Sequence, residues 1–397
     1  MSGRPSRMRL VHVVLSLLVA VSLATAPAAG ASSAPSPAPS APTGSAPSVG
    51  VHVHGTWSTY TDAERLVVLD RLAAAGVGWI RLDLGWASYE ERCSGCTSQW
   101  YVDRADRVID AARARGIKVL AQVGMTPVWA SPGGGTNAPP ADVREFGRFM
   151  RWLSAHLAGR VDAYEIWNEP NLKRFWNGTP AQYVRLAQVG YSAVKDVDPG
   201  VPVVLGGTSY NDTSWLRQAY DAGAAGSFDV LATHPYLAPS DQAPGTADTK
   251  GTNIYLLTHV ASVRRLMVER GDGHKQIWFT EFGWSNHQNT GTESNWNRGV
   301  TEQQQAEFLL QTLDLVRTRY PYVTHVFWYN DRDRGVSSSH IDNYGLLRRD
   351  LSVKPAYTAL QSRLRPTAAS AVPASAAERP VGVRRVVRQV RPAGPVR

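Results

Sequence analysis

Residues 163–171 read AYEIWNEPN, an apolar run that stops at the polar pair Asn168-Glu169 and is followed at once by Pro170. Proline lacks a backbone N–H and restricts the residue before it to extended geometry, so a strand does not continue through it. The stretch therefore predicts a buried β-strand with Glu169 at its carboxyl end. A carboxylate in that position can belong to a buried ion pair, to a solvated turn or to a functional site.

Short apolar runs of this kind recur along the chain, and a longer segment with helical spacing follows each one. The expected strands are 51–54, 78–82, 118–123, 163–167, 203–206, 228–232, 276–280 and 323–328. Strands that alternate with helices in one body of this size predict an α/β fold, a closed (β/α)8 TIM barrel in a single domain. A doubly wound open sheet is the alternative, but the first strand lacks the glycine-rich phosphate turn that such a sheet needs to act on nucleotides.

The two ends of the chain differ in composition from this body. Residues 1–31 combine a basic start, an apolar run and small residues, which is the pattern of a secretory signal peptide; an uncleaved anchor is the alternative. Residues 32–48 form a Ser/Ala/Pro-rich linker, and residues 366–397 form a disordered Ala/Pro/Arg-rich tail. We therefore expect a secreted, extracellular protein whose catalytic domain occupies residues 49–365.

The formal net charge of +9 is concentrated in the same two ends. Three arginines lie within the first nine residues. From Glu378 to the end, the chain has six arginines and only one acidic residue. The body is therefore close to neutral, and its charge indicates neither a nucleic acid partner nor an integral membrane partner. A monomer is the default expectation for a secreted barrel.

The sequence has only two cysteines, Cys93 and Cys96, in the segment ERCSGC. In a secreted protein, their simplest interpretation is a disulfide that closes a small loop. A redox pair or half of a zinc site is the alternative for a CxxC pattern. A zinc site would need further ligands, and the sequence offers neither a second CxxC nor a nearby HxxxH.

In a (β/α)8 barrel, the functional site forms at the carboxyl ends of the strands. Two carboxylates are expected there, Glu169 after the fourth strand and Glu281 after the seventh, facing each other across the barrel. Two carboxylates at close quarters do not both ionise easily, so one pKa is expected to be high and the other low. Glycosidic cleavage needs such a pair, one protonated acid for the leaving oxygen and one anion facing the anomeric carbon.

Each glutamate could instead pair with a buried basic residue for structure alone, and Arg81 is the candidate partner of Glu281. That interpretation does not explain the aromatic residues near both glutamates. Tryptophans that fall in or beside the segments after strands are Trp86, Trp129, Trp176, Trp284, Trp296 and Trp328. We expect Trp129 and Trp328 to contact a sugar. A two-carboxylate mechanism uses no metal, so neither a metal nor a cofactor is expected.

The segments WNEPN after the fourth strand and TEFGW after the seventh resemble those of the retaining glycoside hydrolases of clan A. Over roughly residues 50–360, the chain is most similar to family 39 and its exopolysaccharide-hydrolysing relatives. The resemblance implies Glu169 as general acid/base and Glu281 as nucleophile.

The resemblance also implies roles for the neighbouring residues. Asn168 would bind the sugar 2-hydroxyl, and Arg81 would hold the charge of the nucleophile. Tyr236, with His234 beside it, would hydrogen-bond the nucleophile. Trp328 would form the floor of the sugar subsite next to the scissile bond.

Two other functions fit parts of the pattern. His52 and His54 stand two apart on the first strand, as in metal-dependent amidohydrolases, and His234 and Asp331 could supply later ligands. The fifth strand, PVVLGGT, lacks the histidine that such an enzyme needs, so we expect His54 to be a neutral hydrogen-bonding wall of a sugar site. The second alternative is a barrel that binds polysaccharide without cleaving it.

The function expected from the sequence is that of a secreted retaining glycoside hydrolase. It would cleave β-linked O-glycosidic bonds of a poly- or oligosaccharide by a double displacement that uses two glutamates.

Overall fold

The computed structural model describes residues 45–335 and 339–365 of the chain. The signal peptide expected at 1–31, the tail expected at 366–397 and all but the last few residues of the linker expected at 32–48 lie outside the described residues. Ser48, which the sequence placed in that linker, is the first residue of a strand.

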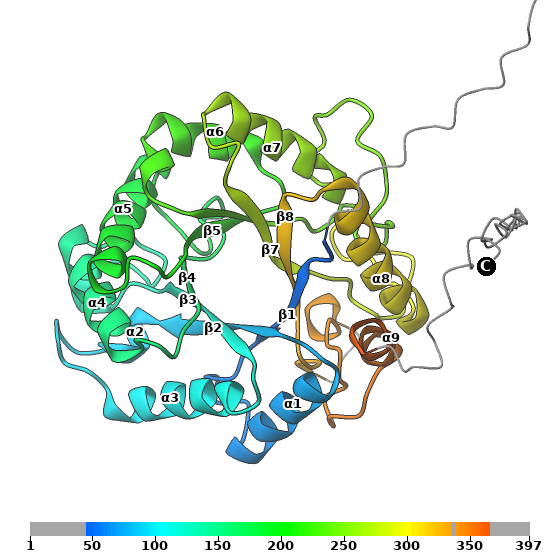
Figure 1. The fold of residues 1–397 in the computed structure, drawn as a ribbon, viewed down its shortest axis with the longest axis horizontal. Helices are drawn as coiled ribbons and strands as arrows, with labels where there is room; N and C mark the ends of the chain where they lie inside the picture. The colour runs from blue at the N-terminus through cyan, green and yellow to red at the C-terminus, as the bar shows by residue number, and fades with distance from the viewer. Residues whose placement is uncertain (1–44, 336–338, 366–397) are drawn as a thin grey trace, which may run out of the picture. The chain divides into compact units, whose positions relative to one another are not determined.

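Eight parallel strands close into a barrel in the order β1 to β8, and β8 pairs with β1 to complete the ring (Figure 1). The strands are β1 (Ser48–Val53), β2 (Trp79–Gly85), β3 (Lys118–Gly124), β4 (Ala163–Ile166), β5 (Val203–Ser209), β6 (Val230–His234), β7 (Gln276–Phe282) and β8 (Val323–Trp328). The predicted α/β fold, a (β/α)8 TIM barrel, is therefore confirmed. Each expected strand is present, and its ends lie within three residues of the predicted ones.

Helices surround the barrel on its outside (Figure 1). They are α1 (Asp62–Ala74), α2 (Trp86–Tyr89), α3 (Gln99–Arg113), α4 (Val143–His156), α5 (Pro180–Val197), α6 (Thr213–Asp221), α7 (Val260–Glu269), α8 (Glu302–Arg319) and α9 (Pro355–Leu364). Reciprocal capping boxes fix the starts of three of them: Thr61 for α1, Thr179 for α5 and Thr301 for α8.

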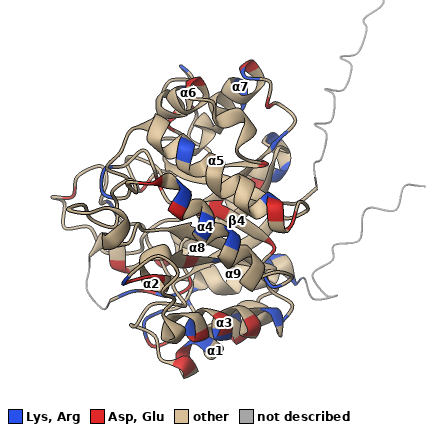
Figure 2. Cartoon of the chain, turned by 90° about the vertical axis from the view of Figure 1, so that its left-hand side faces the viewer, with Lys and Arg blue, Asp and Glu red and all other residues tan. Residues whose placement is uncertain are grey.

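The outer surface carries charges of both signs. On the side seen in Figure 2, basic and acidic residues alternate over the helices, and neither sign gathers into a separate face. This mixture agrees with the near-neutral body expected from the sequence. None of the helices in the described ranges combines the length and the apolarity that a membrane span requires.

The inside of the barrel holds an apolar layer, and all its side chains except that of Phe327 come from the first three residues of their strands. It consists of Trp79, Leu120, Ala163, Val204, Val230, Ala232, Trp278 and Phe327. Gly50 on β1 makes room for this layer, because a Cβ at that position would lie 2.3 Å from Cδ1 of Phe327. Side chains two residues further along a strand point to the same face, so Arg81 on β2 and Glu165 on β4 lie directly above the layer. The apolar layer thus closes the bottom of the barrel and leaves a polar layer beneath the carboxyl-terminal opening.

Gly207 on β5 provides a test of how tightly this polar layer is packed. A Cβ at Gly207 would lie 2.4 Å from Nε2 of His234. We expect Gly207→Ala to lower the free energy of unfolding by about 1–3 kcal/mol, because the buried imidazole must move. Gly226→Ala is the matched control, since nothing lies within 4 Å of its Cβ. Chemical denaturation that gave equal losses for the two variants would contradict this packing.

Candidate active site

A cavity of about 1110 Å³ opens at the carboxyl-terminal ends of the strands. Of the residues predicted for the site, His54, Asn168, Glu169, Tyr236 and Glu281 line its wall. Arg81 and His234 are fully buried and lie behind that wall, in contact with the residues that form it. The structure thus brings together seven of the residues that the sequence placed at this opening.

The two glutamates meet at one imidazole. Nδ1 of His234 lies 3.1 Å from Oε1 of Glu169 and 3.8 Å from Oε2 of Glu281. A carboxylate oxygen of each glutamate and a ring nitrogen of His234 all lie within 4.8 Å of one another. Carboxyl groups about 5–5.5 Å apart are typical of retaining glycosidases, whereas inverting enzymes hold theirs about 6.5–9.5 Å apart. The spacing here fits the retaining arrangement.

Glu281 on β7 is held as an anion. Nη1 of Arg81 donates to its Oε1 at 2.7 Å, and the hydroxyl of Tyr236 donates to its Oε2 at 2.9 Å. Burial alone would raise the pKa of Glu281, but His234, Arg81 and His52 together lower it well below the usual range. Glu281 therefore presents a buried, ionised carboxylate at the cavity wall.

Arg81 on β2 also binds two further residues. Its Nε donates to Oε2 of Glu165 at 2.6 Å, and its Nη2 donates to Oδ1 of Asn168 at 2.8 Å. Oε1 of Glu165 accepts from the backbone N–H of Gly207. Sequence reasoning passed over Glu165, although a glutamate in the middle of an apolar strand signals a buried charge that needs a partner.

Trp328 does not form the floor of the cavity, so that prediction is wrong. It is fully buried, its Nε1 donates to the backbone carbonyl of Tyr344, and it packs edge-on against Phe282. Side chains alternate along a strand, and Phe327 belongs to the apolar layer inside the barrel. Trp328 therefore points outward, and the next residue, Tyr329, lines the cavity.

Trp129 also lies outside the cavity wall, contrary to the prediction. Its Nε1 donates to the backbone carbonyl of Glu90 at 2.6 Å, and its ring packs edge-on against Trp86. These contacts turn the indole toward the loop that follows β2. The aromatic residues that do line the cavity are Trp57, Trp167, Phe175, Tyr210, Tyr236, Trp296, Tyr329 and Tyr344. Trp57 stands in an irregular loop after β1, where no sequence period signals its direction.

Backbone strain is concentrated at this wall. The non-glycine residues with positive φ in the described chain are Met125, Trp167, Glu169, Tyr210 and Leu351, and all except Leu351 line the cavity. Such conformations cost about 1–3 kcal/mol each and persist where the surrounding structure imposes them. The strained pair around Asn168 aims Trp167 and Glu169 into the cavity.

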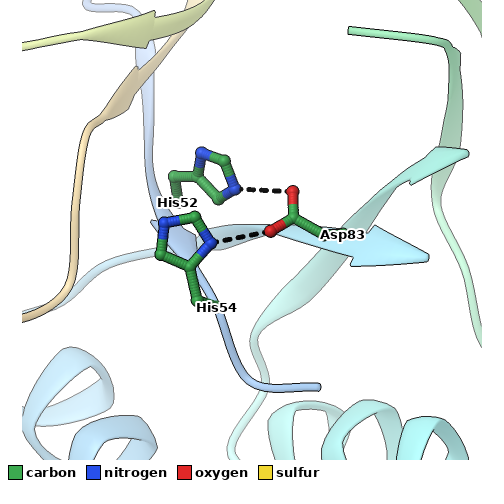
Figure 3. Close-up of side chains that lie close together, drawn as sticks. All are labelled: His52, His54 and Asp83. Atoms are coloured by element: carbon green, nitrogen blue, oxygen red, sulfur yellow. Dashed lines mark hydrogen bonds and ion pairs between the residues drawn. The ribbon is translucent and has the colours of Figure 1, made fainter. Parts of the chain in front are cut away.

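Asp83 on β2 lies between two histidines of the β1 end (Figure 3). Nε2 of His52 is 2.8 Å from Oδ1 of Asp83, and Nδ1 of His54 is 2.7 Å from Oδ2. Burial alone would raise the pKa of Asp83, but the two histidines hold it well below the usual range. No role was predicted for Asp83 from the sequence. The structure presents it as an ionised group on the cavity wall.

The two histidines differ in charge. Burial alone would lower the pKa of His52, but Asp83 raises it to about 9, so His52 is protonated at neutral pH. Its Nδ1 lies 3.4 Å from Oε1 of Glu281 and 3.1 Å from Nη1 of Arg81. Burial and the charge of His52 lower the pKa of His54, which agrees with the neutral His54 expected from the sequence.

The metal-site alternative is not supported by this arrangement. His52 and His54 group with Asp83, whereas His234 groups with the two glutamates. Asp331 accepts a hydrogen bond from the hydroxyl of Tyr60.

Cys93 and Cys96 lie in the loop between α2 and α3, apart from the residues that line the cavity. Their Cα atoms are 5.2 Å apart, within the range that disulfides span. The disulfide itself stays a prediction.

Comparisons with known proteins found both sequence relatives and solved structures of similar fold. The sequence profile of the cellulase family (glycosyl hydrolase family 5) matches residues 40–333. The chain is 30% identical over 159 residues to a β-xylosidase of Caldicellulosiruptor saccharolyticus, covering 36% of this chain and 32% of that protein. It is 29% identical over 152 residues to a β-xylosidase of Geobacillus stearothermophilus, covering 34% and 30%. The chain thus spans about a third of the length of the curated relatives it matches.

A solved structure shares the fold more fully. A family 39 glycoside hydrolase from the gut symbiont Bacteroides cellulosilyticus WH2 superposes with a TM-score of 0.64 at 25% identity. The match covers 80% of this chain and 63% of that one.

His52 should make stability depend on pH. Its folded pKa of about 9 lies above the ordinary 6.5, so the stabilisation is complete below pH 6.5 and is lost as the pH rises through 9. We expect the free energy of unfolding to fall by up to roughly 3 kcal/mol over that window. Asp83→Asn should remove most of the fall, and urea denaturation from pH 6 to 10 measures it.

Asp106→Asn is the control for this experiment. Asp106 pairs with the half-exposed His156 at 2.9 Å, so its loss removes an Asp–His contact far from the cavity wall. The fall between pH 6.5 and 9 should persist in this variant. If the free energy of unfolding of Asp83→Asn still fell as much as that of the wild type between pH 6.5 and 9, Asp83 would not be the cause of the pH dependence.

Proposed function

The chain belongs to the cellulase family of glycosyl hydrolases (family 5), and from this membership we propose that the protein is a retaining glycosidase acting on β-linked poly- or oligosaccharides. Family membership confirms the predicted resemblance to clan A glycoside hydrolases. The observation that carries the proposal is the cluster of Glu169, His234 and Glu281. It presents two carboxylates to one cavity at a spacing that fits double displacement.

In the first step, a carboxylate oxygen of Glu281 attacks the anomeric carbon, and the bond from that carbon to the leaving oxygen breaks. Glu169 gives its proton to the leaving oxygen, so a neutral alcohol departs and a covalent glycosyl-enzyme remains. The ionised state of Glu281 supports its role as nucleophile. Arg81 and Tyr236 hold one carboxylate oxygen each and fix the direction of attack.

The hydrogen bonds behind Glu169 support its role as the acid. The Thr280 hydroxyl donates to Oε1 of Glu165 at 2.8 Å, so its oxygen accepts from Nε2 of His234 at 3.0 Å. Nε2 of His234 therefore carries a proton, and Nδ1 faces Oε1 of Glu169 at 3.1 Å. This contact holds the carboxyl group of Glu169 at the cavity wall, where it would give its proton to the leaving oxygen.

In the second step, Glu169 takes a proton from water, and the hydroxide attacks the anomeric carbon from the face that the leaving group vacated. The bond from the sugar to Glu281 breaks, and the proton taken from water stays on Glu169 for the next cycle. The configuration at the anomeric carbon is retained after two inversions. Asn168 supports the transition state of both steps. Its Oδ1 is occupied by Arg81, so its Nδ2 is the donor left for the sugar 2-hydroxyl.

Asp83 would bind the sugar that is transferred. About a fifth of its side chain is exposed (22%), and each oxygen already accepts from one histidine. The remaining lone pairs can accept hydrogen bonds from two neighbouring hydroxyls of the sugar. Tyr329 takes the position on the cavity wall that the sequence had assigned to Trp328.

The proposal includes the location of the protein. The signal pattern in residues 1–31 supports secretion, and the close approach of Cys93 and Cys96 supports a disulfide in an oxidising compartment. The catalytic domain would be residues 49–365, acting as a monomer without a cofactor.

Removing either glutamate tests the mechanism. We expect Glu281→Ala to lose at least about 10⁴-fold in kcat on 4-nitrophenyl β-glycosides of xylose, mannose and glucose. Glu169→Ala should lose roughly 10²–10⁴-fold on disaccharides, and less on the nitrophenyl compounds, whose leaving group needs little protonation. Added azide should yield an α-glycosyl azide with Glu281→Ala and a β-glycosyl azide with Glu169→Ala.

Glu307→Ala is the control, because Glu307 lies on α8 and, among the described residues, its side chain hydrogen-bonds only to Gln303 one turn away. It should keep wild-type activity. Hydrolysis that survives in Glu281→Ala at more than a hundredth of the wild-type rate would refute its role as nucleophile.

A further inference from the structure

A second hollow of about 570 Å³ adjoins the active-site cavity. Arg174, Ser209, Tyr210 and Trp296 line both spaces, so the two lie side by side. The mechanism above uses none of these four residues. The second hollow therefore lies beside the active site, and the mechanism assigns no part of the substrate to it.

The second hollow lies on the side of Glu169. Nη2 of Arg174, on the shared wall, is 3.2 Å from Oε2 of Glu169. Asp83 and His54, which would bind the transferred sugar, line the first cavity but not the second. Since the acid protonates the leaving oxygen, the leaving group departs toward this hollow.

Three aromatic rings line the second hollow, and two of them, Tyr210 and Trp296, also line the first cavity. Tyr255 packs edge-on against Tyr210 and Trp296, with ring centroids 4.9 and 4.8 Å away. Trp296 remains 45% exposed, a large fraction for an indole held among other rings. A flat apolar face with polar edges suits the face of a sugar ring.

The segment that carries Trp296 is fixed before any ligand arrives. Asn289 closes it with a pair of hydrogen bonds to the backbone of Gly299, at 2.9 and 2.7 Å. Ser240, from the segment after β6, bonds the carbonyls of Asn295 and Arg298 on both sides of the indole. Binding to a wall that is already ordered avoids the entropy cost of ordering it.

We propose that this second hollow binds the sugar residues of the leaving group that lie beyond the one carrying the scissile oxygen, with Trp296 stacking on a ring. The substrate is then an oligo- or polysaccharide that continues on its leaving-group side, and simple glycosides and disaccharides are poor substrates. This inference rests on the proposed glycosidase function and specifies its substrate class.

Chain length tests the inference. We would measure kcat/KM for the 4-nitrophenyl β-glycosides of xylose, mannose and glucose, and for the β-1,4-linked di- to pentasaccharides of the same sugars. Aryl glycosides keep the leaving group small, whereas oligosaccharides extend it. In the wild type, kcat/KM should rise from di- to tri- and tetrasaccharide.

Substitution of Trp296 localises the effect. Trp296→Ala should lose roughly five- to tenfold more kcat/KM on tetrasaccharides than on the aryl glycosides, and Trp296→Phe should restore part of the difference. Trp100→Ala is the matched control, because Trp100 on α3 is 59% exposed and lies outside both hollows. It should show no dependence on chain length.

The outcomes separate the inference from the function on which it rests. Aryl glycoside activity without any gain for longer oligosaccharides, or equal losses on both substrates in Trp296→Ala, would overturn the inference alone. Wild-type inactivity on every aryl glycoside and oligosaccharide would count against the proposed function, and the inference would fall with it.

Discussion

Arg81 is a buried cation, and the arrangement of the barrel interior depends on how its charge is compensated. A guanidinium removed from water costs several kcal/mol unless its donors are paired in good geometry. Here the planar fork binds Glu165 of β4, Glu281 of β7 and Asn168 beyond the end of β4. Because the fork is rigid, the two carboxylates that compensate the buried charge of Arg81 are held in fixed positions. The same hydrogen bonds therefore orient the carboxylate of Glu281, the proposed nucleophile.

The two glutamates on the cavity wall obtain different roles from different neighbours. Glu281 faces Arg81, His52 and the Tyr236 hydroxyl, which favour its ionised form. Glu169 faces His234, whose Nε2 is hydrogen-bonded to the hydroxyl of Thr280, and that hydroxyl donates to Glu165. Both glutamates stand above the apolar layer that closes the barrel, so the polar groups that tune them are shielded from water on the lower side.

Strand-end reasoning located most of this site from the sequence. Glu169 and Glu281 stood out because each interrupts an apolar run, and parallel strands in a closed barrel bring such interruptions to one face. The same reasoning failed for Trp328. Side chains alternate between the two faces of a strand, but the sequence does not say which of the two alternating sets points into the barrel. Strand-end reasoning also failed for Trp129, which lies in a short 3-10 helix and is turned away by its hydrogen bond to Glu90, and it gave no signal for Trp57, which stands in an irregular loop. Glu165 was within reach, since Arg81 and Glu165 are the mid-strand charges of β2 and β4.

The central claim, that Glu281 forms a covalent bond to the sugar, can be tested by trapping. The wild type would be incubated with 2-deoxy-2-fluoro-β-glycosides that carry a good leaving group, because the fluorine slows hydrolysis of the intermediate. Peptide mapping by mass spectrometry would then locate the added mass. The account predicts one sugar per chain, on the peptide that contains Glu281, with loss of activity in step with labelling. A label on another carboxylate, or turnover without any label and with inverted product, would contradict it.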